Sequence, residues 1–380
     1  MMKDRTAECM IHLAVCAANR RRPDLNLIEN ADLDAVYTLA SLHMISAAVA
    51  FALESAGYRD TCSSEILALA VNKAVNFEME WNELQGKLSE AGIWSMPLKG
   101  ALLKDYYPQT GMREFVDYDI LIDPQYEQET KEIMENQGYT PERSWASNEK
   151  TYFKSPFLNF EIHTSLFGPE DDPVLYAYYH NPEDKLRGSG YQKSFSPEDF
   201  YLYFVAHEYK HYMGAGAGFR SLMDLYLYLN RQTVDMAYVS EEAEKLGLRE
   251  FEEQHRTLAF HLFREEELTD ADQKMLEYIL SSGSFGTFEQ RIRKEIKRYG
   301  GSRIRYMLKR FHIPFSRKNK DYAVFEAYYP FFYRHKVLLP LLPVCWLFRG
   351  IRNGKLRREV RTLMNVKKTE KENNRQNLSE

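Results

Sequence analysis

Cysteine is scarce in this sequence, and the few cysteines form no known pattern. Cys9, Cys16, Cys62 and Cys345 are the four cysteines among 380 residues, and no two of them form a C-x-x-C pair. A disulfide-stabilised secreted fold and a zinc site built from cysteine thiolates are therefore not expected, and a reducing compartment is favoured. The first residues, MMKDRTAECM, are not followed by the apolar stretch of an export signal.

Uncharged runs long enough to cross a membrane are scarce as well. Residues 35–53 carry no formal charge, but polar side chains interrupt them, and Asp34 and Glu54 flank them. We expect a buried helix here, from Asp32 to Leu53. The apolar run 337–348 contains two prolines and is too short to span a bilayer. These features predict a cytoplasmic protein.

The composition is that of a folded protein. Hydrophobic residues make up 44% of the chain and aromatic residues 14%, which excludes a disordered or low-complexity protein and allows sizeable cores. The length exceeds what one compact core usually holds, so two or three domains are expected.

Charge is distributed unevenly along the chain, whose formal net charge is −5. Residues 291–368 contain 22 lysines and arginines but four acids, a charge of +18, so the rest of the chain carries −23. A basic segment of this kind meets a polyanion, such as an anionic membrane surface, or packs on the protein's own acidic body. The sequence leaves both possibilities open.

Hydrophobic periodicity divides the chain into regions of different class. Helical spacing and a stop at Gly92 predict a helix over 65–91. Ser196-Pro197 and Asp123-Pro124 are expected to begin helices. Short apolar runs predict strands at 93–98, 115–122, 151–154 and 158–166, and a helix is expected at 100–107. The predicted order is a helical region (1–90), an α+β core (91–195), a helical domain (196–290), the basic segment (291–368) and a disordered tail (369–380).

Two aspartates on one expected strand are the most informative feature. Asp117 and Asp119 lie two positions apart within FVDYDILI, so a strand places both on one face and apolar residues on the other. Neighbouring carboxylates repel each other, and burying them without a counter-charge is costly. A divalent cation removes this conflict, and carboxylates with open positions suit Mg²⁺ better than zinc.

The later stretch LNFEIHTSL carries a third acid. In a strand, Asn159, Glu161 and His163 share one face, while Phe160 and Ile162 share the other. If this strand lies beside the first, Glu161 joins the two aspartates around the metal. The alternative is an edge strand with a solvated polar face.

Lys99 and Gly100 stand where a strand turns into a helix. Glycine permits close backbone approach, and a helix N-terminus offers N–H groups to a phosphate, to which Lys99 adds a positive charge. Most turns of this kind bind nothing. Arg113 would either clamp a phosphate or neutralise the acidic cluster. Arg220 and Asp224, at i and i+4 of a later helix, predict an ion pair.

The order of these motifs resembles the nucleotidyltransferases of the DNA polymerase β superfamily, and more specifically a family of uncharacterised nucleotidyltransferases. The resemblance is carried by the run K-G-A…Y…R…D-x-D-x-L-I from Lys99 to Ile122, a third acid on a later strand, and the helix pair that contains His207 and His211. It covers about residues 90–230. Ala101 departs from the superfamily pattern, in which a phosphate-binding serine is common.

This resemblance implies a polymerase-β-like α+β core and Mg²⁺-dependent transfer of an NMP from an NTP, with ATP the expected donor, to an unidentified acceptor. Asp117 and Asp119 would hold two Mg²⁺ ions, and Glu161 would complete the ion that activates the acceptor hydroxyl. The Lys99–Gly100 turn would hold the triphosphate tail, and pyrophosphate would leave. Further candidate nucleotide contacts are Arg113, His163, His207 and His211.

A competing motif, H-E-x-x-H, spans His207 to His211. On a helix both histidines lie on one face, and Glu208 would be the general base of a zinc peptidase, with Asp224 or Glu242 as third ligand. The strand that usually accompanies such a helix is missing from the pattern. Two other interpretations place the histidines at the nucleotide site or treat them as ordinary helix residues with hydrogen-bond partners.

The basic segment contains an amphipathic part and an apolar part. Residues 291–310 combine clustered basic residues with apolar ones at helical spacing, and VLLPLLPVCWLF lies between Lys336 and Arg349. Together they would contact an anionic membrane peripherally, at its inner face, or close the helical core. A non-catalytic membrane- or partner-binding protein on the same fold is therefore a further alternative. Specific nucleic-acid binding is not expected, because basic residues alone bind polyanions without reading sequence.

Overall fold

The structure is a computed structural model that describes residues 4–142, 148–169, 171–214, 216–284 and 329–343, and the single positions 305, 308, 315 and 345. The chain divides into two compact units, Met1–Phe285 and Gly286–Glu380. Most of the basic segment expected over 291–368, and all of the tail expected over 369–380, lie outside the described residues. Among the described helices, none combines the length and apolar character that a membrane span requires.

The first unit begins with helices that bury the uncharged run near the N-terminus. They are α1 (Arg5–Asn19), α2 (Leu25–Glu29), α3 (Leu33–Leu42), α4 (Ser46–Ala56) and α5 (Thr61–Glu90). The single helix expected from Asp32 to Leu53 is wrong, because the chain turns between α3 and α4, where Met44 has a left-handed φ of 57°. The N–H groups of His43 and Ile45 both donate to the Ala40 carbonyl, which closes α3. Helix α4 contacts α1, α3 and α5, and most of its residues are buried, whereas Thr38, Ser41 and Leu42 of α3 are exposed.

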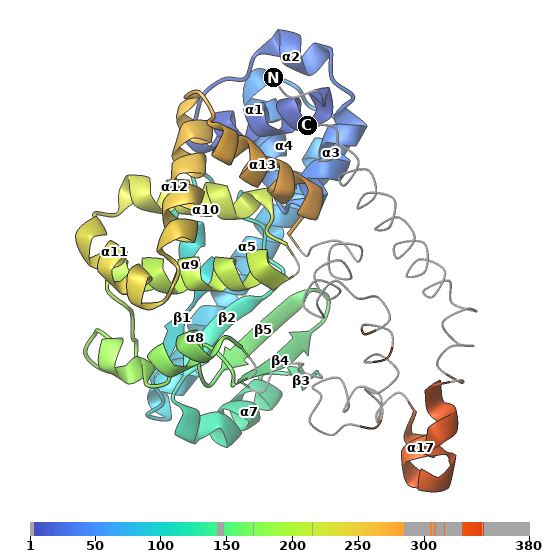
Figure 1. Cartoon of the computed structure of the whole chain (residues 1–380), viewed down its shortest axis with the longest axis vertical. Helices are drawn as coiled ribbons and strands as arrows, with labels where there is room; N and C mark the ends of the chain where they lie inside the picture. Colours follow the sequence, from blue (N-terminus) through green and yellow to red (C-terminus); the bar gives the residue numbers. More distant parts are fainter. Residues whose placement is uncertain are drawn as a thin grey trace. The chain divides into compact units, whose positions relative to one another are not determined.

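The long helix α5 leads from this helical region to the sheet (Figure 1). Its first turn is closed by a reciprocal pair of hydrogen bonds: the Asp60 carboxylate accepts from the Ser63 N–H, and the Ser63 hydroxyl accepts from the Asp60 N–H. The chain leaves the helix at Gly92, whose φ of 77° favours glycine. The helix expected over 65–91 is confirmed.

A five-stranded mixed sheet forms the α+β core. Its strands are β1 (Ser95–Pro97), β2 (Tyr118–Ile122), β3 (Thr140–Pro141), β4 (Glu149–Lys154) and β5 (Leu158–His163). The order is β1-β2-β5-β4-β3; β2 and β5 pair in parallel, and the other neighbours pair antiparallel. The strand expected over 115–122 begins at Tyr118, so Asp117 lies directly before it. All residues of β2 are buried.

Short helices connect the strands. They are α6 (Lys99–Leu103), η1 (Lys104–Tyr106), η2 (Pro124–Tyr126) and α7 (Glu127–Asn136). Together α6 and η1 form the helix expected over 100–107. The Asp123 carboxylate accepts a hydrogen bond from the Gln125 N–H at 3.2 Å and Pro124 follows it, which confirms the predicted helix start.

An aromatic core lies between α5 and the sheet. Phe77 of α5 contacts Phe115, Tyr118 and Phe160, with ring centroids 5.5 to 5.7 Å apart. Tyr139 meets Phe160 edge to face at 5.4 Å. Because Tyr118 and Phe160 pair directly across β2 and β5, this packing fixes which face of the two strands is apolar. Asp119 and Glu161 therefore point to the opposite face.

A second group of helices completes the first unit. They are α8 (Pro173–Tyr178), η3 (Pro182–Lys185), α9 (Pro197–Gly214), α10 (Phe219–Arg231), α11 (Met236–Lys245), α12 (Arg249–Arg264) and α13 (Asp270–Ser282). The Ser196 hydroxyl accepts from the Asp199 N–H, so the predicted start of α9 is confirmed. These helices share one apolar core with α1, α3 and α4. In the second unit the described elements are α17 (Pro330–Arg334) and η5 (Lys336–Leu341).

Phe77→Ala tests the aromatic core. It is expected to lower the free energy of unfolding by about 3–5 kcal/mol, because it removes a buried ring and leaves a cavity. Met79→Ala is the matched control on the same helix: this side chain is 66% exposed, and its removal is expected to change stability by less than about 0.5 kcal/mol. Urea unfolding followed by circular dichroism measures both, and equal losses would contradict this packing.

Candidate active site

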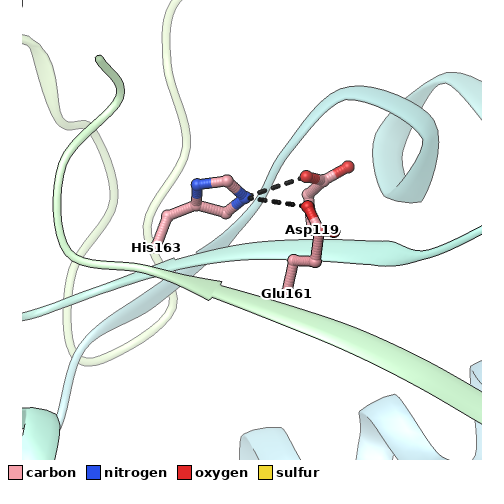
Figure 2. Close-up of side chains that lie close together, drawn as sticks. All are labelled: Asp119, Glu161 and His163. Carbon is pink, nitrogen blue, oxygen red and sulfur yellow. Dashed lines mark hydrogen bonds and ion pairs between the residues drawn. The ribbon is translucent and has the colours of Figure 1, made fainter. Parts of the chain in front are cut away.

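Asp119 and Glu161 lie side by side on the two parallel strands. The register pairs Asp119 with Glu161 and Leu121 with His163. The side chains of Asp119, Glu161 and His163 converge (Figure 2), and one ligand atom of each lies within 4.8 Å of the others. Within the part of the chain that the structure describes, no other group of three His, Cys, Asp or Glu side chains comes this close.

Asp119 is held by two partners on the same oxygen. Its Oδ1 accepts a hydrogen bond from Lys99 Nζ at 2.7 Å and lies 2.8 Å from His163 Nε2. Asp119 is only 4% exposed, and burial alone would raise its pKa. The Lys99 ammonium and the bond to His163 outweigh burial and hold the pKa of Asp119 well below its usual value. Asp119 is therefore ionised.

The pKa values of the two neighbouring carboxyls, Glu161 and Asp117, are raised instead. Burial, and then the charges of Asp117 and Asp119, raise the pKa of Glu161 to about 8. Burial and the charge of Asp119 raise the pKa of Asp117. When all three are ionised, their charge exceeds what the Lys99 ammonium neutralises. A hard divalent cation prefers carboxylate oxygens and supplies the missing positive charge, so these residues fit Mg²⁺.

Of the three carboxylates predicted as metal ligands, the structure brings Asp119 and Glu161 together and leaves Asp117 outside their close group. Asp117 lies directly before β2, acts on Glu161 through its charge, and stands outside the close group of three. His163, which the sequence analysis took as a nucleotide contact, belongs to that group. Its Nδ1 lies 3.9 Å from Glu149 Oε2. The E-x-H spacing on one strand face was the signal that pointed to it.

The Lys99–Gly100 turn follows β1 and is shaped by Arg113. Lys99 has a φ of 42°, an uncommon backbone conformation for a residue with a side chain. A Cβ placed on Gly100 would overlap the Arg113 guanidinium. Close approach therefore requires glycine here, but what approaches in the structure is an arginine.

Arg113 cannot move aside, because a buried ion pair fixes it. Its Nε and Nη2 donate to the two carboxylate oxygens of Asp224 on α10, at 2.8 and 2.9 Å, and the Tyr107 hydroxyl donates to the same carboxylate at 2.7 Å. All three side chains are buried. The ion pair predicted between Arg220 and Asp224 is longer, with Nε 3.9 Å from Oδ2. Arg113 is thus the closer of the two ion-pair partners of Asp224.

Helix α9 carries His207 and His211 one turn apart, with their Nε2 atoms 3.1 Å from each other. Burial and then the charge of Lys99 lower the pKa of His207 far below its usual value and that of His211 to about 4. Burial raises the pKa of Glu208, between them, to about 7. The charge of Lys99 at the carboxylate site thus acts on the titratable residues of this stretch of α9.

The third ligands that a zinc peptidase would need are engaged elsewhere. Asp224 is bound by Arg113 and Tyr107, and Glu242 accepts hydrogen bonds from Tyr178 and Lys245. A catalytic zinc site needs three protein ligands. The described residues around H-E-x-x-H supply two histidines without such a third ligand.

Comparison with known families identifies the chain. The family model described as "Uncharacterised nucleotidyltransferase" matches residues 29–264. The chain belongs to this family. The nucleotidyltransferase is thus a transferase of phosphorus-containing groups with an α+β core, as the resemblance in the sequence implied. No curated protein and no solved structure matches it significantly.

The family match spans more of the nucleotidyltransferase than its sheet. It begins before α3 and ends with α12, so it includes Lys99, the carboxylates, the histidines of α9 and the Arg113–Asp224 pair. The helix that supplies Asp224 therefore lies within the matched region, whereas the basic segment beyond 290 does not.

Asp224→Asn tests the buried ion pair of the nucleotidyltransferase. It leaves the Arg113 charge buried without its counter-ion and is expected to cost about 3–5 kcal/mol of stability. Glu265→Gln is the control, because it breaks the Arg21–Glu265 pair, in which both side chains are nearly half exposed; the expected loss is about 0–1 kcal/mol. Chemical unfolding compares the two, and a loss for Asp224→Asn no larger than for the control would contradict the assigned pair.

The raised pKa of Glu161 makes the stability of the metal-free protein depend on pH. The carboxyl keeps its proton up to about pH 8 when folded but loses it near 4.5 when unfolded, so the folded state binds more protons between these values. Stability contributed by this group therefore falls as the pH rises from about 5 to about 8. Thermal unfolding in EDTA is expected to show a shallower fall for Glu161→Gln than for wild type. Identical slopes would show that Glu161 is ionised throughout.

Proposed function

We propose that this nucleotidyltransferase transfers an NMP from an NTP to an acceptor hydroxyl with the help of Mg²⁺ at the Asp117, Asp119 and Glu161 carboxylates. The observation that carries the proposal is the pairing of Asp119 with Glu161 on parallel strands. When their carboxyls are ionised, the site holds more negative charge than its own ammonium group balances. ATP is the first donor to test, and the acceptor is not assigned.

The proposal assigns two Mg²⁺ ions to these carboxylates, with His163 beside them. Bound there, the ions would activate the acceptor hydroxyl and stabilise the charge that develops on the transferred phosphate. The protein's contribution is the arrangement of anionic oxygens on rigid strands. Because β2 and β5 are interior strands of the sheet, the separation of Asp119 and Glu161 is fixed by backbone hydrogen bonds.

Lys99 and His163 orient Asp119. Both bind Oδ1, and no described residue donates a hydrogen bond to Oδ2, which is the oxygen available to a cation. In this arrangement Lys99 acts first as a counter-ion that keeps Asp119 ionised. Gly100 and Arg113 shape the adjoining turn. With His207 and His211, these residues are the proposed contacts around the nucleotide.

In the proposed reaction, the acceptor oxygen bonds to the α-phosphorus of the NTP, the bond from that phosphorus to the bridging oxygen breaks, and pyrophosphate leaves. The acceptor proton is released to solvent. Positioning and charge stabilisation account for the acceleration, and little side-chain acid–base work is required.

A thermal-shift panel of NTPs with and without Mg²⁺ tests the proposal. Wild type is expected to be stabilised by at least one NTP only when Mg²⁺ is present, and Asp119→Asn and Glu161→Gln are expected to lose that shift. Pyrophosphate release with an active acceptor is expected to fall about 100-fold or more in each variant, the scale of loss when one electrostatic element of an active site is removed.

Glu129→Gln is the control for this panel. Glu129 is an exposed acid on α7 of the same α+β core, so its loss is expected to change neither the shift nor the turnover. If wild type shows no NTP-specific stabilisation with Mg²⁺, or if both site variants bind as wild type does, the proposed function fails.

A further inference from the structure

The two histidines of α9 form a close pair beside the carboxylate site. His207 and His211 occupy successive turns, their Nε2 atoms lie 3.1 Å apart, and their rings meet edge to face with centroids 4.4 Å apart. One imidazole must donate to the other through these atoms, since both Nε2 atoms cannot be acceptors or donors at once. Their Nε2 atoms thus point into one common space.

Lysine charges lower the pKa of both histidines of this pair. After burial, Lys99 of α6 acts most strongly on both histidines, and Lys210 of α9 also lowers the pKa of both; on His207, the ring of His211 acts more strongly than Lys210. Arg220 of α10 also lowers the pKa of His211 and His163 of β5 that of His207, whereas Asp119 of β2 raises that of His211. The Glu208 carboxyl, whose Oε1 lies 3.8 Å from His207 Nδ1, is the acid beside the pair. Neutral imidazoles in a positive field suit an anionic ligand.

The side chains expected to bind phosphate at the Lys99–Gly100 turn are already engaged. Lys99 donates to Asp119 at 2.7 Å, and Arg113 gives two donors to Asp224. Gly100 lies against the Arg113 guanidinium. A phosphate group at this site therefore needs donors from another element, and α9 supplies them.

We propose that His207 and His211 bind the polyphosphate tail of the donor nucleotide, each through an Nε2–H group that donates to a phosphate oxygen. This inference rests on the proposed function and deepens it. When phosphate replaces the bond between the two rings, the ring that accepted it must carry its proton on Nε2, either by moving it from Nδ1 or by binding one from solvent. The side chains of Lys99 and Arg220 supply the surrounding positive charge.

Titration calorimetry with inorganic pyrophosphate in EDTA tests the site without any metal. The double variant His207→Phe/His211→Phe keeps two rings but removes their N–H donors. Its affinity for pyrophosphate is expected to fall about tenfold or more, since a hydrogen bond to a charged group contributes about 1.5–3 kcal/mol, or roughly a factor of ten or more. Unchanged affinity would overturn the proposal.

Two further variants control for folding and for shape. His207→Gln/His211→Gln keeps side-chain N–H donors and is expected to recover part of the lost affinity. His180→Phe replaces an exposed histidine after α8 that packs against Tyr176, and it is expected to bind pyrophosphate as wild type does. Equal losses of pyrophosphate affinity in the double Phe, the double Gln and the His180→Phe variants would overturn the assignment to the α9 pair.

The experiment also separates this inference from the proposed function. If wild type binds Mg²⁺–NTP and the double Phe variant binds it with unchanged affinity, the histidine assignment alone fails. If wild type shows no Mg²⁺-dependent NTP binding, the proposed function fails first. Pyrophosphate that binds together with NTP, rather than in competition with it, would identify an acceptor phosphate and overturn the assignment to the donor tail.

A transition-metal ion is the other occupant that two histidines at i and i+4 can hold. Zn²⁺ titration of wild type and of the double Phe variant distinguishes it. Zinc that binds one-to-one and is lost with the histidines, together with an unchanged affinity for pyrophosphate, would overturn the proposal in favour of a metal site. Weak zinc binding with loss of pyrophosphate affinity supports it.

Discussion

The burial of carboxylates on neighbouring parallel strands is the constraint on which the site depends. Tyr118 and Phe160 hold one face of β2 and β5 against the aromatic core, and the alternation of strands then forces Asp119 and Glu161 together on the other face. Lys99 neutralises Asp119 but leaves Glu161 and Asp117 with raised pKa values. The fold thus holds acidic groups ready for a cation, at a cost in stability that its own residues do not remove.

The Arg113–Asp224 pair links α10 to the loop beside this site. Arg113 lies in the loop between the Lys99–Gly100 turn and the carboxylate strand, while Asp224 lies on α10. A buried bidentate ion pair contributes specificity of arrangement more than net stability, because desolvation offsets much of its attraction. Its effect here is to fix the loop that follows α6 against α10. The match of the family model across both regions agrees with this coupling.

The same pair also engages one of the acids that H-E-x-x-H on α9 would need as a zinc site. Helical spacing brings His207 and His211 together in any protein, but a zinc peptidase needs a third ligand that converges on them. One of the two acids proposed from the sequence, Asp224, is bound by Arg113 and Tyr107. The charges that act most on the histidines are then cations, which favour an anion over a metal ion. The neighbours of the motif thus support the proposed phosphate-binding role over a zinc site.

The sequence alone determined the local features of this protein: the α+β core, the capped helices, and the placing of Asp119 and Glu161 on the polar faces of two strands, because hydrophobic period and capping depend on residues close in the chain. Tertiary structure decided the rest. It broke the helix expected from Asp32 to Leu53 at Met44, gave Arg113 a partner in Asp224, and turned Lys99 onto Asp119. Those outcomes depend on contacts between residues up to 111 positions apart, for which spacing along the chain carries no information.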